Sequence, residues 1–407
     1  MNDDEIFAFL RKEILADLEY KGDISDEELD EHIAEKISKY SKEHYIPLNK
    51  KVLLGKQLLH SMRKLDILQD LIDDENVTEI MINGYQSIFV EKAGAIYKTD
   101  KEFASMQRYT DIIQQIVAGC NRAVNDSSPI VDARLMNGSR VNIVLNPVAI
   151  NGPIMTIRRF PDSPFTMNQL ISIGSISKEA AEFLKKLVIS GFNIIVAGGT
   201  GSGKTTFLNA LSASIPSDER IITIEDSAEL QIQGIDNLVR LETKNANVEG
   251  CNPITIRDLI KTSLRMRPDR IIVGEVRGAE AMDMICSAMN CGHDGSMSTV
   301  HANSAKDTIG RLETMILMAV DLPINAIRRQ ICSGVDVIVH LGRLRDKTRK
   351  VLEITELDRC ENGEVQFNEL FRFEENKEST ESRVCGELKQ IGRIKHEDKL
   401  KAAGIKI

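Results

Sequence analysis

The segment Gly198–Thr206, with the sequence GGTGSGKTT, constrains this chain more than any other stretch. It follows the apolar run NIIVA and precedes FLNALSASI, whose apolar residues recur at helical spacing. A strand, a glycine-rich turn and a helix in this order match G-x-x-x-x-G-K-[ST], in which backbone N–H groups and the helix N-terminus surround a phosphate. Glycine suits the turn because it adopts positive φ at low cost. The sequence therefore predicts a phosphate-binding loop within an α/β fold.

The residue types of this loop predict ATP and Mg²⁺ as cofactors. Lys204 is expected to reach the β- and γ-phosphates and to be catalytic, and the Thr205 hydroxyl is expected to bind Mg²⁺. The residues predicted to bind the nucleotide are Gly198, Gly199, Thr200, Gly201, Ser202, Gly203, Lys204, Thr205 and Thr206.

Composition narrows the class of protein. A chain of 407 residues is long enough for two or more domains. Its net charge of -9 and its lack of tryptophan argue against general nucleic-acid binding, which needs basic surface and stacking platforms. The seven cysteines include no C-x-x-C pair, so neither a zinc site nor a disulfide framework is indicated. Without a signal peptide or a long apolar run, we expect a cytoplasmic protein.

Changes in apolar periodicity divide the chain into five predicted segments. Residues 24–40 have apolar positions at helical spacing, and Ser25 is expected to cap this helix together with Glu28. Strand candidates that alternate with helical stretches after residue 173 predict a mostly parallel sheet covered on both faces. The five segments are an N-terminal helical region (1–65), a mixed α/β domain (66–160), a linker (161–172), a second α/β domain (173–372) and a charged C-terminal tail (373–407).

Two further predicted strands end in carboxylates. Glu225 and Asp226 follow RIITI, and Glu275 follows RIIVG. Parallel strands present their carboxyl ends at one edge of a sheet, where ligands bind. We expect Thr205, Glu275 and Glu225 to contribute to the metal site, and either glutamate could be the catalytic base. Gly274 stands where a magnesium-binding aspartate is expected.

Two histidines flank the predicted strand SMSTV. His293 precedes it and His301 follows it. Their position after the Glu275 segment indicates a nucleotide-sensing pair. No cysteine pair or H-x-x-x-H spacing accompanies them, so a zinc site is not indicated.

The motifs in combination resemble the secretion-superfamily ATPases, which power type II and type IV secretion and type IV pili. The resemblance rests on GGTGSGKTTFLNAL, ITIEDSAEL, RIIVGEVRG and CGHDGSMSTVHANS in this order. Upstream, DDENVTEIMINGYQSIFVEKAG, SPIVDARLMNGSRVN and TIRRF are similar to the CpaF branch, the ATPases of Tad (Flp) pili. The resemblance covers roughly residues 65–372. The Gly274–Glu275 strand end is usual in this family, whereas Cys291 stands where we expect threonine.

This resemblance implies an architecture and a role. The expected fold is α/β, with a RecA-like P-loop ATPase domain preceded by a PAS-like α/β domain and the helical region. The family implies a homohexameric ring that hydrolyses ATP to assemble, or also retract, a Tad/Flp-type pilus or a related secretion machine. Implied partners are polytopic inner-membrane platform proteins, which would hold the ring at the cytoplasmic face of the inner membrane. No nucleic-acid partner is expected.

The resemblance also assigns roles to individual residues. Arginines of the N-terminal domain are implied to neutralise the charge that develops in phosphoryl transfer. Arg140 and Arg158 are the preferred catalytic positions, and Arg134 and Arg159 are nucleotide-binding candidates. Arg265, Arg267 and Arg277 are alternatives within the ATPase domain. The remaining implied site residues are Glu225, Glu275 and His301 in catalysis, and Asp226 and His293 in nucleotide binding.

Three other functions are compatible with a phosphate-binding loop. RecA-like rings also include nucleic-acid motors, which single-stranded DNA would stimulate. A small-molecule kinase would transfer phosphate to a metabolite, but the large N-terminal domain and the histidine pair have no place in it. An assembly protein that holds ATP as a structural ligand would not turn over, although the lysine and carboxylates argue against this.

Overall fold

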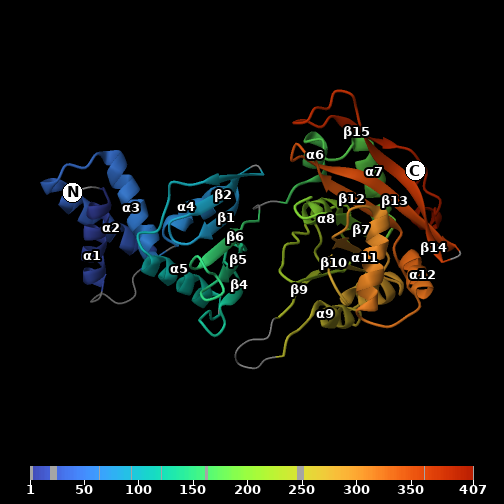
Figure 1. The fold of residues 1–407 in the computed structure, drawn as a ribbon, viewed down its shortest axis with the longest axis horizontal. Coiled ribbons are helices and arrows are strands. Elements are labelled where there is room, and N and C mark those ends of the chain that lie inside the picture. Colours follow the sequence, from blue (N-terminus) through green and yellow to red (C-terminus); the bar gives the residue numbers. More distant parts are fainter. Residues whose placement is uncertain are drawn as a thin grey trace. The chain divides into compact units, whose positions relative to one another are not determined.

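The computed structural model describes residues 3–18, 25–63, 65–92, 94–120, 122–160, 164–244, 252–361 and 363–406. The chain divides into two compact units, Met1–Pro161 and Asp162–Ile407 (Figure 1).

The first unit begins with three helices, α1 (Asp3–Leu18), α2 (Asp26–Glu43) and α3 (Leu48–Arg63). The predicted cap of α2 is confirmed, because the Ser25 hydroxyl accepts from the Glu28 N–H at 3.2 Å and the Glu28 carboxylate accepts from the Ser25 N–H at 2.9 Å. The predicted apolar stripe of α2 forms part of a separate small core, in which Leu29, Ile33 and Ile37 are buried.

An antiparallel sheet of six strands completes the first unit, in the order β3-β2-β1-β6-β5-β4. Turns between strands of this sheet contain Gly84, Gly138 and Gly152, which have φ of 77°, 87° and 100°. The elements are α4 (Ile67–Asp73), β1 (Val77–Asn83), β2 (Ile88–Lys92), β3 (Ala95–Lys98), α5 (Met106–Gly119), β4 (Ile130–Arg134), β5 (Arg140–Val144) and β6 (Ile154–Arg158).

A sheet of nine strands forms the centre of the second unit, in the order β15-β14-β13-β12-β7-β11-β10-β8-β9. The six strands from β12 to β9 run parallel to their neighbours, as predicted, and β13 to β15 extend the sheet antiparallel. The strands are β7 (Ile194–Gly198), β8 (Ile221–Glu225), β9 (Leu238–Glu242), β10 (Arg270–Val276), β11 (Met297–Val300), β12 (Val337–Arg343), β13 (Arg349–Glu361), β14 (Glu364–Glu375) and β15 (Gly386–Gln390).

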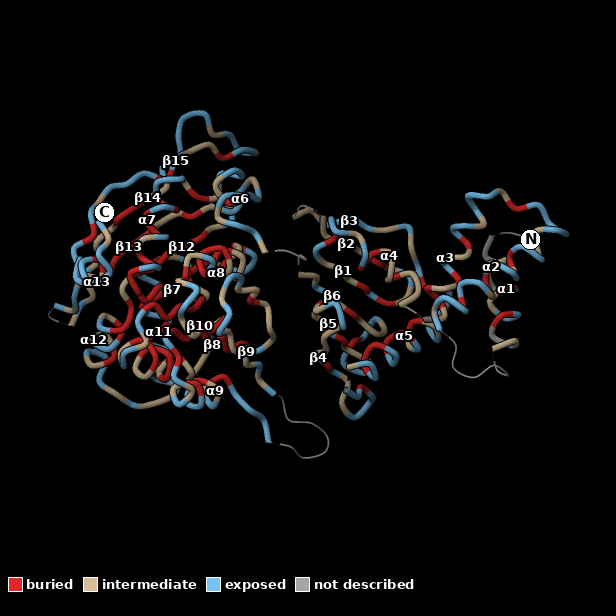
Figure 2. The backbone as a smooth tube through the Cα atoms, turned by 180° about the vertical axis from the view of Figure 1, so that it is seen from behind, coloured by how far each residue is buried: buried red, intermediate tan, exposed pale blue. Residues whose placement is uncertain are grey.

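Helices cover both faces of this sheet, which buries its central strands completely (Figure 2). Ile194 and Val196 of β7 pack in one core, and Ile195 and Ala197 pack in the other, which explains the continuous apolar run before the loop. The helices are α6 (Met167–Ser172), α7 (Lys178–Ile189), α8 (Lys204–Ser212), α9 (Ile256–Ser263), α10 (Glu280–Met282), a π-helix (Asp283–Met289), α11 (Ala305–Leu317), α12 (Ile324–Gly334) and α13 (Asp398–Ala402).

The C-terminal residues correct the expectation of a separate charged tail at 373–407. β15 pairs with β14, and Leu388 and Leu400 are buried in the core that also contains α7. The buried carboxylate of Glu356 accepts from the backbone N–H groups of Lys395 and His396 and so holds this segment against the sheet. An edge strand and a one-turn helix bury few residues each, so their sequence looks like a charged tail.

The expected linker, 161–172, is shorter than predicted. Residues 167–172 form α6, which is capped by Thr166 and buries Leu170. Residues 161–163 lie outside the described residues.

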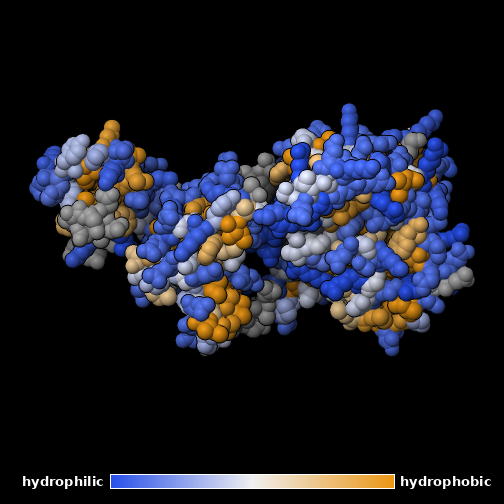
Figure 3. All heavy atoms as spheres, turned by 45° about the horizontal axis from the view of Figure 1, so that its top comes forward, coloured by the Kyte–Doolittle hydropathy of each residue, from blue (hydrophilic) through white to orange (hydrophobic). Residues whose placement is uncertain are grey.

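The surface of both units on the face shown in Figure 3 is mainly hydrophilic, with hydrophobic residues in small groups. Exposed hydrophobic side chains include Leu48 and Val52 on α3. In the part of the chain that the structure describes, no helix has the length and apolar character needed to cross a membrane.

Candidate active site

The loop between β7 and α8 has the conformation expected of a phosphate-binding loop. Gly201 and Gly203 have φ of 70° and 91°, a region that L-amino acids other than glycine rarely adopt. A Cβ at Gly198 would lie 2.5 Å from the carbonyl oxygen of Leu341 and from the Ser202 hydroxyl. Three glycines of the motif are therefore required by backbone geometry or by close approach.

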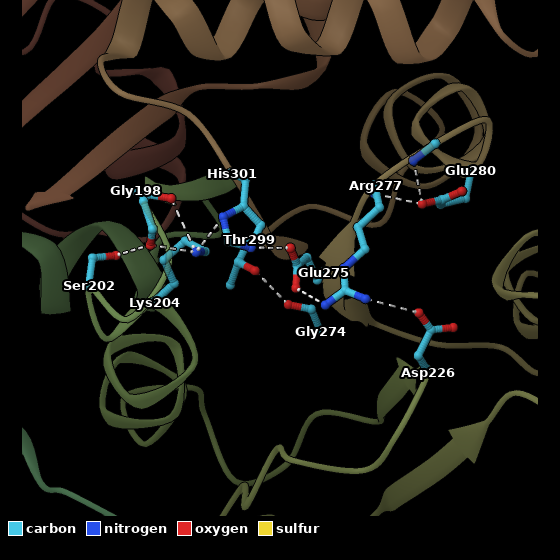
Figure 4. Close-up of polar contacts among 12 residues, drawn as sticks. Gly198, Ser202, Lys204, Asp226, Gly274, Glu275, Arg277, Glu280, Thr299 and His301 are labelled. Carbon is cyan, nitrogen blue, oxygen red and sulfur yellow. Dashed lines mark hydrogen bonds and ion pairs between the residues drawn. The ribbon is translucent and has the colours of Figure 1, made fainter. Parts of the chain in front are cut away.

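Lys204 begins α8, and its side chain lies in this loop with only 8% of the residue exposed. Its Nζ donates to the carbonyl oxygens of Gly198 and Gly199, each at 3.1 Å, and lies 3.3 Å from Nδ1 of His301 (Figure 4). These three acceptors are neutral. Phosphate oxygens carry negative charge and are stronger acceptors for an ammonium group, so a bound nucleotide can replace them.

His301 connects the loop to the strand end of β10. Its Nε2 lies 2.8 Å from Oε1 of Glu275. This is an ion-pair distance, but the oxygen accepts no directed hydrogen bond from any described residue. Burial lowers the pKa of His301, against the opposing effect of Glu275, and the Lys204 charge lowers it further. A neutral ring can accept from Lys204 at Nδ1 and carry its proton on Nε2, toward Glu275.

Glu275 and Arg277 continue the row of contacts along the strand ends. The other Glu275 oxygen accepts from Nη2 of Arg277 at 2.8 Å, and Nη1 of Arg277 lies 3.8 Å from Asp226. The hydrogen bond to Glu275 raises the pKa of Arg277. Glu275 retains a side-chain exposure of 20%, so water reaches it. Lys204, His301, Glu275, Arg277 and Asp226 thus form one continuous polar row (Figure 4).

Glu225 takes a different position from the one predicted. It ends β8 with 3% exposure, and its Oε1 accepts from the backbone N–H groups of Glu229 and Leu230, each at 2.8 Å. Its Oε2 is buried without a hydrogen-bond partner among the described residues, and burial raises its pKa to about 7. This carboxylate shapes the turn after β8 and is closed to solvent, which corrects the expectation that it faces a metal or an attacking water.

The position of Glu225 also explains Gly274. A Cβ at Gly274 would lie 2.9 Å from Cγ of Glu225, so the buried carboxylate occupies the space of any side chain there. Packing against Glu225 therefore explains why position 274 holds glycine rather than the aspartate expected of a magnesium-binding strand end.

His293 does not join the row. It precedes β11, whereas His301 follows it, so the strand separates them by its full length. Its Nδ1 lies 3.1 Å from the carbonyl oxygen of Pro268, ahead of β10. Within one chain, the two histidines lie at opposite edges of the sheet, so only His301 belongs to this row, and a nucleotide-binding role of His293 stays a prediction. Arg265 and Arg267 also precede β10 and lie at that far edge.

The candidate arginines of the first unit divide into two kinds. Arg134, Arg140 and Arg158 are directly opposite one another across β4, β5 and β6. They alternate with the buried residues of these strands, so they lie on the face away from the core. Glu79 of β1 lies directly opposite Arg158 and adds one negative charge to this row. Arg159 instead donates to the carbonyl oxygens of Asp74 and Val77, which is a structural role.

The residues present fit a nucleotide with Mg²⁺. Among the residues that the structure describes, no cluster of three or more His, Cys, Asp or Glu could hold a metal ion alone. Magnesium usually takes one or two protein ligands and fills its octahedron with phosphate oxygens and water. Thr205 in the first turn of α8 and the accessible Glu275 can supply that share.

Two arginines beside the loop were not identified from the sequence patterns. Nε of Arg349 donates to the carbonyl oxygen of Gly201 at 2.8 Å, and Arg343 lies opposite Arg349 in the next strand. Only the pairing of β12 with β7 brings them there, and no spacing in the sequence reveals that pairing.

Comparisons with known proteins show the family to which this chain belongs. The family model described as "Type II/IV secretion system protein" matches residues 61–398. A putative conjugal transfer protein of Mycobacterium tuberculosis is 34% identical over 306 residues, which cover 74% of this chain and 86% of that protein. VirB11, a type IV secretion system protein of Brucella suis, is 34% identical over 304 residues, or 68% of this chain and 84% of its own.

A solved structure shows the same fold. The Legionella pneumophila ATPase DotB superposes with a TM-score of 0.51 at 20% identity, covering 72% of this chain and 80% of that chain. The predicted α/β fold class is confirmed. With the loop geometry and the extent of the family match, the chain carries a phosphate-binding loop and belongs to the Type II/IV secretion system protein family.

Proposed function

We propose that this chain hydrolyses ATP with Mg²⁺ in a homohexameric ring and thereby drives assembly of a Tad/Flp-type pilus or a related secretion machine. The row from Lys204 through His301 to Glu275 carries the proposal, because it joins a phosphate-binding group to an accessible carboxylate within one unit. The pilus branch is supported by the upstream segments that resemble Tad ATPases, and relatives named for conjugal transfer and type IV secretion support the wider class.

The proposed mechanism assigns one task to each residue. Lys204 leaves its carbonyl acceptors and binds the β- and γ-phosphates. Glu275 orients and deprotonates the attacking water, because it is accessible and Glu225 is not. His301 contacts both Lys204 and Glu275. A movement of Lys204 toward a bound phosphate would therefore change the surroundings of the base, Glu275. Thr205 and Glu275 would hold Mg²⁺, which when bound would stabilise the negative charge of the phosphates.

The arginine row of the first unit completes the proposed site. Arg134, Arg140 and Arg158 present three guanidinium groups in register, which suits an incoming phosphate chain. Arginine fingers accelerate phosphoryl transfer by about 10³–10⁵. Release of this contact after hydrolysis would let the two units move relative to each other and produce the working stroke.

We propose that the movement produced by hydrolysis acts on membrane proteins. Polytopic platform proteins of the inner membrane are the proposed partners, with the ring at the cytoplasmic face. The helices α1 to α3, which expose Leu48 and Val52, are the proposed docking region.

Turnover of ATP by a Lys204→Ala variant tests the function. We expect loss of turnover, because the phosphates lose their buried cation, while Lys185→Ala on the exposed side of α7 behaves as wild type. Wild-type turnover in Lys204→Ala would refute the proposal. Stimulation of the wild type by single-stranded DNA would point to a nucleic-acid motor instead.

The choice between the two glutamates needs its own comparison. We expect Glu275→Gln to bind ATP and to lose turnover by about 10²–10⁴, the range for a general base. Glu225→Gln should keep at least a tenth of wild-type turnover, because its amide can still accept both backbone N–H groups. The reverse result would make Glu225 the base.

A further inference from the structure

The side of the loop away from His301 also carries positive charge. β12 lies beside β7 on the side opposite β11 and β10, and β13 returns along it. Arg343 ends β12 and Arg349 begins β13, and the two are directly opposite each other. Opposed residues of an antiparallel pair point to the same face. Both arginines are exposed.

Both side chains reach the phosphate-binding loop. Nε of Arg349 donates to the carbonyl oxygen of Gly201 at 2.8 Å. Cδ of Arg349 lies 3.5 Å from the point where a Cβ of Gly203 would be, and Nη1 of Arg343 lies 3.9 Å from the corresponding point at Gly201. The outer wall of the loop is therefore cationic.

An anion between these two arginines would stabilise the pair. Like charges directly opposite in a sheet are unfavourable. Within the described ranges, no carboxylate comes within ion-pair distance of Arg349, whose Nε contacts only a carbonyl oxygen. A phosphate between two guanidinium groups turns their repulsion into charge-assisted hydrogen bonds. The neighbouring loop binds phosphates, so the phosphate groups of a nucleotide are the anions expected to reach these arginines.

The direction of the nucleotide follows from the strand order. Lys204, His301 and Glu275 lie toward β11 and β10, so a bound nucleotide would place its γ-phosphate on that side. Its α-phosphate and ribose would then extend toward β12 and β13. We propose that Arg343 and Arg349 form an arginine clamp, supplied by the same chain as Lys204, that binds this end of the nucleotide. The inference rests on the proposed ATPase function and adds two binding residues to it.

Three substitutions of Arg349 separate nucleotide binding from support of the loop. Arg349→Ala removes both the charge and the hydrogen bond to Gly201, Arg349→Gln keeps a donor without charge, and Arg349→Lys keeps the charge. Arg359→Ala, an exposed arginine of the same strand paired with Glu361, is the matched control. The measurements are the Kd for ADP, the KM for ATP and kcat, with thermal unfolding to verify the fold.

The clamp predicts a rise in Kd and KM with little change in kcat. A lost charged hydrogen bond corresponds to about 10- to 100-fold in affinity, so Ala and Gln should weaken ADP binding at least about tenfold. Lys should stay within about threefold of wild type, and kcat should change by less than about threefold in all variants. Arg343→Ala should shift Kd in the same direction and replaces Arg349→Ala if that variant does not fold.

Three results would overturn the clamp. Unchanged ADP affinity in Arg349→Ala and Arg343→Ala removes both residues from the site. Wild-type affinity in Arg349→Gln reduces Arg349 to a support for the loop. A fall in kcat at unchanged ADP affinity moves it to the hydrolysis step. Failure of the wider function looks different, because ATP turnover would then survive Lys204→Ala whatever the Arg349 variants do.

Discussion

At the scale of single residues, Gly274 is predicted to be intolerant of even one methyl group. In Gly274→Ala the new Cβ would meet Cγ of the buried Glu225 at 2.9 Å. Overpacking of this kind costs about 1–3 kcal/mol, which urea unfolding would reveal. Gly310→Ala is the control, because nothing lies within 4 Å of its Cβ and alanine in α11 should stabilise by about 0.5–1 kcal/mol. Equal stability of the two variants would contradict the packing account of Gly274.

The buried Glu225 predicts a pH dependence of stability. Its pKa rises from the ordinary 4.5 to about 7 in the folded chain, so the folded chain holds this proton more tightly than the unfolded chain. Its contribution to stability therefore declines as pH rises from about 4.5 to 7, by on the order of 3 kcal/mol, and stays lost above that window. Glu225→Gln cannot ionise, and its unfolding midpoint relative to wild type should rise between pH 5 and pH 8. A constant difference between the two proteins would show that Glu225 does not titrate there.

At the scale of elements, α13 is predicted to be a structural part of the second unit. Leu400 is 2% exposed in the core that α7 and β14 share. Leu400→Ala should cost about 2–4 kcal/mol, and the exposed Lys401→Ala should change stability by less than about 0.5 kcal/mol. Chemical unfolding of both variants measures this. Identical midpoints for the two would restore the charged tail expected from the sequence.

The elements also show which patterns predicted the fold and which could not. The parallel strands were predictable, since burial on both faces makes each a continuous apolar run, as in β7. The loop was predictable because its chemistry fixes both residue types and spacing. β15 and α13 were missed because each buries too few residues to produce a recognisable periodicity of apolar residues in the sequence. Arg343 and Arg349 were missed because their place beside the loop depends on which strand pairs with β7.

At the scale of the whole molecule, the sequence patterns named more site residues than one unit brings together. Lys204, His301, Glu275 and Asp226 meet along adjacent strand ends. His293 lies at the far edge because a strand has two ends, and a spacing of residues does not say which end faces the ligand. The arginine row belongs to the first unit and the phosphate loop to the second, so the proposed contact between them does not follow from the geometry of either unit.

Mixing Lys204→Ala with Arg140→Ala, each of which we expect to lower turnover, tests whether that contact forms between neighbouring chains. Lys204→Ala lacks the phosphate lysine but keeps the arginine row, and Arg140→Ala keeps the lysine but lacks the central arginine of the row. If each site in a ring takes its lysine from one subunit and its arginine from the next, random mixing in equal amounts restores about a quarter of the sites. ATP turnover of the mixture should then exceed that of either variant alone. Turnover equal to the average of the two variants, in rings shown by sizing to have exchanged subunits, would place Arg140 and Lys204 of each site in the same chain.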